Sequence, residues 1–77
     1  MNVRKLNGSG WVLYVMDSCI HCHRQMELLK GFTNIVHCDR RSPHKNIKGY
    51  PCWFNSITGK VIYGYQDINN LKIMMGG

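Results

Sequence analysis

The fold of this chain is decided by residues 11–22, which read Trp-Val-Leu-Tyr-Val-Met-Asp-Ser-Cys-Ile-His-Cys. Residues 11–16 are apolar at every position, which predicts a central strand that is covered on both faces. Asp17 and Ser18 then offer side chains that cap helices, so we expect a helix over residues 19–30. Two cysteines, Cys19 and Cys22, are therefore expected where a buried strand turns into a helix.

The expected helix has one apolar face and a defined end. Cys22, Met26 and Leu29 lie at spacings of four and three, which places them on one side of a helix. Gly31 follows as a natural stop. Residues 34–38 then predict a short strand, and a strand–helix–strand unit implies that its two strands pair in parallel.

The second half of the chain predicts a hairpin and a helix. Residues 39–49 are polar and basic, and we expect at most one helical turn there. Two further strands, 52–54 and 61–63, are joined by a short connection that contains Gly59, which is typical of a hairpin. Asp67 is placed to cap a last short helix through Ile68, Leu71 and Met75.

Composition limits the classes of function. The 77 residues allow one small domain, and a hydrophobic fraction of 44% is typical of a globular protein. The net charge of +6 is dispersed, with no run of more than two basic residues, so we expect no nucleic-acid partner. Residues 1–10 predict a loose lead-in without the features of a signal peptide, and the apolar run 11–16 is too short to span a membrane. We therefore expect a cytoplasmic protein without a membrane partner, in which four cysteines indicate catalysis or metal binding.

Three features resemble the thioredoxin superfamily in its small, glutaredoxin-sized form. They are the Cys-x-x-Cys at the strand-to-helix turn, Gly49-Tyr50-Pro51 leading into a strand where the family has a cis-proline, and the hairpin 58–65 with Gly64 before the last helix. Leu13 stands where thioredoxins carry a buried acid, which resembles glutaredoxins more. The resemblance covers about residues 11–75. It implies an α/β minimal thioredoxin fold, β-α-β followed by β-β-α, with a four-stranded mixed sheet and helices packed on it, as a single domain over residues 11–77.

The same resemblance and the chemistry of the motif predict a thiol–disulfide oxidoreductase acting in electron transport. A helix N-terminus stabilises a thiolate, so Cys19 is the expected nucleophile, and Cys22 on the buried face is the expected resolving thiol. His21 is expected to tune the reactive sulfur, making the disulfide more oxidising. Tyr50 and Pro51 are expected to bind a disulfide-containing protein substrate along an extended edge. We expect a monomer without an organic cofactor or metal ligand, recharged by glutathione or a reductase.

The other cysteines and histidines have plainer expectations. Cys38 is expected to pack in the core, and so is Cys52, although a resolving or regulatory role stays open for Cys52. His23 is expected to form a surface pair with Glu27, four residues further along the helix.

Two alternatives remain at this stage. A small zinc domain is conceivable because the chain has enough nitrogen and sulfur ligands, namely Cys19, Cys22, His23, His37, Cys38, His44 and Cys52. Residues 19–23 also satisfy the haem-attachment pattern Cys-x-x-Cys-His, with Met74 or Met75 as a conceivable axial ligand. Metal content, a count of thiols and a Soret band distinguish these alternatives from the redox prediction.

Overall fold

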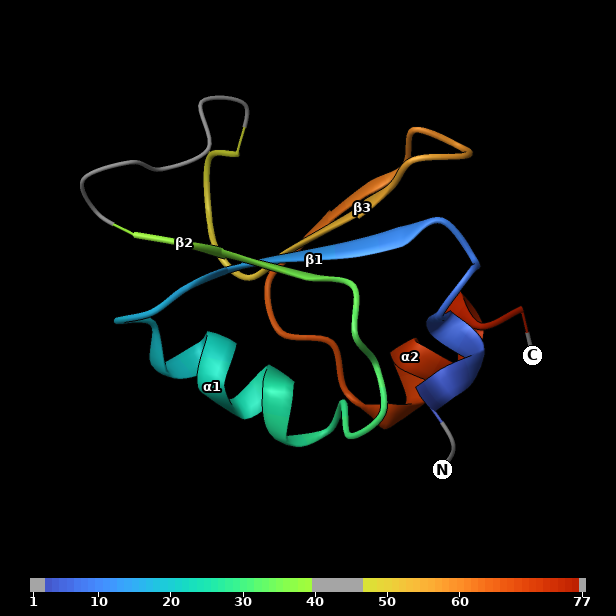
Figure 1. Cartoon of the computed structure of the whole chain (residues 1–77), viewed down its shortest axis with the longest axis horizontal. Coiled ribbons are helices and arrows are strands. Elements are labelled where there is room, and N and C mark those ends of the chain that lie inside the picture. The colour runs from blue at the N-terminus through green and yellow to red at the C-terminus, as the bar shows by residue number, and fades with distance from the viewer. Residues whose placement is uncertain (1–2, 40–46, 77) are drawn as a thin grey trace.

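The computed structural model describes residues 3–39 and 47–76 as an α/β structure (Figure 1). In chain order its elements are the 3-10 helix η1 (Val3–Leu6), β1 (Trp11–Met16), α1 (Ile20–Glu27), β2 (Ile35–Cys38), β3 (Cys52–Asn55), β4 (Val61–Tyr63) and α2 (Ile68–Met74). The four predicted strands are therefore all present.

The strands form one mixed sheet in the order β2-β1-β3-β4. Strand β1 pairs in parallel with β2 and antiparallel with β3, and β3 pairs antiparallel with β4. The parallel strand–helix–strand unit and the hairpin are thus confirmed. Because β1 is an inner strand, the residues that follow its last position leave the sheet at the carboxyl end of β1, between its neighbours β2 and β3.

Both helices lie on the same side of the sheet in Figure 1, and the core lies between them and the strands. Its buried residues come from every layer: Val3, Leu6, Trp11, Leu13, Val15, Cys22, Leu29, Phe32, Trp53 and Leu71. The predicted central position of β1 is confirmed. Cover on both faces was also expected, but buried and half-buried residues alternate along the strand, so one face is covered fully and the other only in part. An apolar residue at every position did not distinguish the two faces, which depend on where the helices pack.

Helix α1 begins and ends differently from the prediction. Cys19 is its N-cap, where Asp17 or Ser18 was expected, and its last residue is Glu27. The following backbone tightens, because the N–H groups of Leu28 and Leu29 donate to carbonyls three residues earlier at 3.2 and 3.0 Å. The chain then leaves the helix and reaches Gly31, whose φ of 98° lies in the left-handed region that favours glycine.

The N-terminal segment is part of the packed structure. A loose lead-in was expected over residues 1–10, but Val3 and Leu6 of η1 are buried in the core. Their three-residue spacing places both on one side of a 3-10 helix, where they share the core with Leu71 of α2.

At the other end of the chain the cap of α2 is confirmed, because the Asp67 side chain accepts the Asn70 N–H at 2.9 Å. The helical turn expected within residues 39–49 falls largely on residues 40–46, outside the described residues. In the described parts of the chain, no helix has both the length and the apolar character needed to cross a lipid bilayer.

Candidate active site

The site is centred on Cys19, which caps the N-terminus of α1. Its backbone is extended, with φ −94° and ψ 117°, and its Sγ accepts the Cys22 N–H at 3.4 Å. The Cys19 N–H in turn donates to the Met16 carbonyl at 3.0 Å, which ties the cap to the end of β1. The sulfur of the half-buried Cys19 therefore receives a hydrogen bond from an N–H group of the first helical turn that has no partner within the helix.

Cys22 lies behind Cys19 and is fully buried, with 0% of its surface exposed. Burial is the main reason why the pKa of this thiol rises from the ordinary value of 9.0 to about 12. The Met16 N–H, 3.5 Å from Sγ, lowers the pKa in part, whereas a hydrogen bond with the Cys19 side chain and the charges of Cys19 and Cys38 raise it further. Cys22 is thus protonated at neutral pH and adjoins the Cys19 sulfur.

A distant segment completes the site. The Tyr50-Pro51 peptide bond is cis, as the sequence resemblance implied. The Cys19 thiol donates to the Tyr50 carbonyl at 3.7 Å, across 31 residues of chain. The two residues predicted to bind substrate are therefore brought to Cys19, with Tyr50 half-buried and Pro51 buried.

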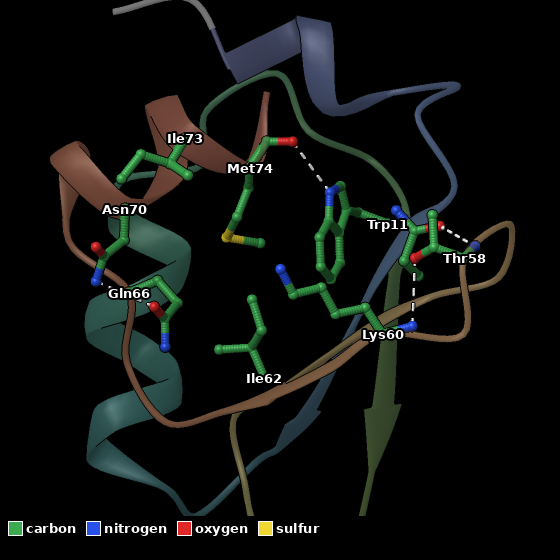
Figure 2. Close-up of a pocket in the computed structure, with 9 residues that line it drawn as sticks. Trp11, Thr58, Lys60, Ile62, Gln66, Asn70, Ile73 and Met74 are labelled. Carbon is green, nitrogen blue, oxygen red and sulfur yellow. Dashed lines mark hydrogen bonds between the residues drawn. The ribbon is translucent and has the colours of Figure 1, made fainter. Parts of the chain in front are cut away.

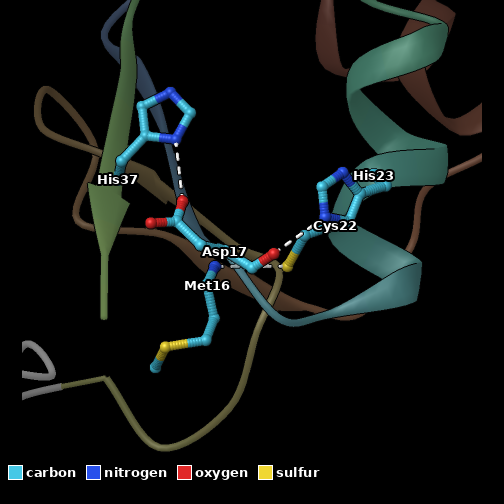
Figure 3. Close-up of polar contacts among 5 residues, drawn as sticks. All are labelled: Met16, Asp17, Cys22, His23 and His37. Carbon is cyan, nitrogen blue, oxygen red and sulfur yellow. Dashed lines mark hydrogen bonds and ion pairs between the residues drawn. The ribbon is translucent and has the colours of Figure 1, made fainter. Parts of the chain in front are cut away.

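The histidines around the site take places that the sequence did not indicate (Figure 3). His23 was expected to pair with Glu27, but its Nε2 bonds the Asp17 carbonyl at 2.8 Å. This bond bridges the first turn of α1 to the segment that leads into it. The Asp17 carboxylate points away to His37, with 3.5 Å between Oδ1 and Nδ1. Since these two side chains are 70% and 57% exposed, the ion pair contributes little to stability.

His21 lies in the first turn of α1 and is exposed. It lies between Cys19 and Cys22 in the sequence, and its role in tuning the reactive sulfur stays a prediction.

Cys38 and Cys52 are buried thiols, as expected. Burial also raises the pKa of Cys52. In residues 3–39 and 47–76, no three His, Cys, Asp or Glu side chains gather closely enough to hold a metal ion. His44, one ligand of the zinc alternative, lies outside these ranges.

Sequence reasoning missed Gln25, which is fully buried on α1. Its Oε1 accepts the Gln66 N–H at 2.6 Å and the Trp53 Nε1–H at 3.3 Å, and its Nε2 donates to the Gln66 carbonyl at 2.9 Å. One side chain therefore joins α1 to β3 and to the segment before α2. This fixes the helix that carries both cysteines.

Comparison with known proteins found no family model that matches this chain and no curated protein with significant sequence similarity.

Proposed function

We propose that this protein is a thiol–disulfide oxidoreductase with a minimal thioredoxin-like fold, in which Cys19 is the nucleophile and Cys22 the resolving thiol. The observation that carries the proposal is the pairing of the two sulfurs at the start of α1. One is half-buried and accepts an N–H of the first turn, whereas the other is buried behind it and kept protonated. The mixed sheet, with its helices on one face, and the cis Tyr50-Pro51 bond beside Cys19 support the same proposal.

The reaction begins with attack of the Cys19 thiolate on one sulfur of a substrate disulfide. The substrate S–S bond breaks, its other sulfur leaves as a thiolate that takes up a proton, and a mixed disulfide with Cys19 forms. Cys22 then loses its proton and attacks the Cys19 sulfur, which releases the second substrate thiol. Two electrons pass from the enzyme dithiol to the substrate, and the enzyme is left with a Cys19–Cys22 disulfide.

The raised pKa of Cys22 suits this order of events. As long as Cys22 is protonated it does not compete for the first attack, and it becomes reactive once it loses its proton beside the mixed disulfide. Glutathione or a reductase would return the pair to the dithiol, and the reverse sequence would oxidise a substrate. Tyr50 and Pro51 supply main chain beside the reacting sulfur, where an extended protein substrate could pair. His21 would tune the potential. The proposed enzyme acts as a monomer in the cytoplasm and needs no organic cofactor.

The proposal is tested by serine substitution at each cysteine of the motif. Disulfide reduction of a protein substrate should be abolished in Cys19→Ser, whereas Cys22→Ser should accumulate mixed disulfides that are identified by mass. Cys38→Ser, which changes a buried thiol outside the motif, serves as the matched control and should retain activity. Full activity of Cys19→Ser would reject the assignment.

The equilibrium redox potential in glutathione buffers extends this test. A Cys19–Cys22 disulfide that forms and is reduced over a defined glutathione ratio supports the proposal. Bound zinc in the purified protein, with the motif thiols protected from modification, would instead favour the metal-binding alternative.

A further inference from the structure

A pocket of about 380 Å³ lies between α2 and the β3–β4 hairpin (Figure 2). Trp11, which lines it, begins β1, whereas Cys19 follows the end of the same strand. The six residues of β1 span roughly 17 Å, so the pocket is well separated from the two cysteines. Its volume lies at the lower end of the range of pockets that bind small molecules.

Four of the nine residues that line the pocket are apolar. Ile62 comes from β4, Ile73 and Met74 come from α2, and the Trp11 ring closes one side. The Trp11 indole N–H is already used, because it donates to the Met74 carbonyl at 3.1 Å. This bond ties the end of α2 to the start of β1 and leaves the tryptophan as an apolar wall. Ile73 is 70% exposed, so much of its side chain is accessible to a ligand.

An exposed lysine, Lys60, brings a positive charge to this pocket. In Figure 2 the Lys60 side chain extends across the pocket, and its amine ends between Ile62 and Met74. None of the described residues that line the pocket is acidic, so the ammonium has no counter-charge within it. Thr58 stands beside Lys60, and its Oγ1 accepts the Lys60 N–H at 3.3 Å, which leaves the hydroxyl proton free to donate to a ligand.

The amide side chains of the pocket are largely engaged within the protein. Asn55 Oδ1 accepts the N–H groups of Ile57 and Thr58 at 2.9 and 3.0 Å. The Gln66 amide donates to the Gly64 carbonyl at 3.0 Å. The Asn70 amide donates to the Gln66 side-chain oxygen at 3.2 Å. Besides these amides, the polar groups that the pocket offers to a ligand are the Lys60 ammonium and the Thr58 hydroxyl.

We propose that this pocket binds a small organic monocarboxylate with an apolar, aromatic or branched body. The carboxylate pairs with the Lys60 ammonium and accepts from the Thr58 hydroxyl, and the body packs on Trp11, Ile62 and Ile73. Apolar burial contributes affinity, and the single cation selects the charged form of the ligand. The proposal is independent of the thiol chemistry, since it uses none of the cysteines.

The test uses 4-phenylbutyrate and its uncharged analogue 4-phenylbutanamide, titrated into the reduced protein and followed by backbone amide NMR. The carboxylate should bind in the millimolar range or tighter and shift the amide signals of Ile62 and Ile73. Lys60→Met, which keeps the length of the side chain and removes its charge, should weaken carboxylate binding about five-fold and leave amide binding unchanged. Lys60→Arg should retain most of the affinity.

Lys48→Met is the matched control, because it removes an exposed lysine that does not line the pocket and should leave the affinity unchanged. Three results would overturn the proposal: equal affinity of wild-type protein for the carboxylate and the amide, no effect of Lys60→Met, or signal shifts confined to residues outside the pocket.

Discussion

Replacement of Gln25 by Met should destabilise the protein far more than its position on a short helix suggests. The two side chains have similar length and similar helix propensity, so the change removes hydrogen bonds and little else. Three partners lose their bond: the Gln66 N–H, the Gln66 carbonyl and the Trp53 Nε1–H. A buried polar group left without a partner costs about 1–3 kcal/mol.

Three such groups at the lower end of that range, partly offset by the more apolar Met side chain, give an expected loss of about 2–4 kcal/mol in the free energy of unfolding. A chain of this length has a free energy of unfolding of roughly 4–12 kcal/mol. The expected loss is large enough to measure, and it is smaller than most values in this range, so we expect the variant to remain folded. Urea unfolding followed by tryptophan fluorescence and far-UV circular dichroism measures it, with an unchanged m-value as the check on two-state behaviour.

Arg24→Met is the matched control, because Arg24 is the exposed neighbour of Gln25 on α1. It should change the unfolding free energy by less than about 0.5 kcal/mol. A loss below about 1 kcal/mol for Gln25→Met would refute the reasoning, since it would mean that water or other groups replace the three bonds.

Three further predictions concern the ends of the helices and the thiols. At pH 8 iodoacetamide should modify Cys19 long before Cys22, because burial raises the pKa of Cys22 to about 12 and so leaves little of this thiol ionised. Comparable rates for the two cysteines in a peptide map would contradict the burial argument. Asp67→Ala should lower the free energy of unfolding in urea by about 1 kcal/mol, because it removes the side chain that accepts the Asn70 N–H. Asp67→Asn keeps an acceptor and should lose only a small part of this stability, so equal losses in both variants would speak against the cap. Asp17→Asn should change the free energy of unfolding by less than about 1 kcal/mol, because the ion pair of Asp17 with His37 is exposed, and the difference should disappear in high salt. A loss above about 2 kcal/mol would show that this ion pair stabilises the protein more than its exposure implies.

Much of the fold could be predicted because the deciding signals are local. The apolar run 11–16, the hairpin around Gly59 and the cap at Asp67 each act within a few residues, and the structure contains all three. The start of α1 could not be predicted in this way. Asp17 and Ser18 are good caps by residue type, but the Cys19 N–H bonds the last residue of β1, which places Cys19 at the cap position.

The candidate site divides in the same manner. The spacing of Cys19 and Cys22 on a helix could be derived from the sequence, and so could the burial of Cys22. The approach of the Tyr50 carbonyl to Cys19 depends on the antiparallel pairing of β1 with β3, and the bond between His23 and the Asp17 carbonyl replaced the expected pair along the helix. Gln25 has the appearance of a surface residue until its partners, 28 and 41 residues away, are known.

By itself the sequence determined which segments form the four strands and the two α-helices and where the pair of thiols falls, although not the 3-10 helix η1, because hydrophobic periodicity and turn chemistry act over short distances. Tertiary structure decided which face of β1 is more deeply buried and why Cys19 is the N-cap of α1. It also decided that Gln25 bonds to two distant segments and that Lys60 lines the pocket. These features depend on contacts between residues that are far apart in the sequence and come together only on folding, so a short-range sequence pattern does not predict them.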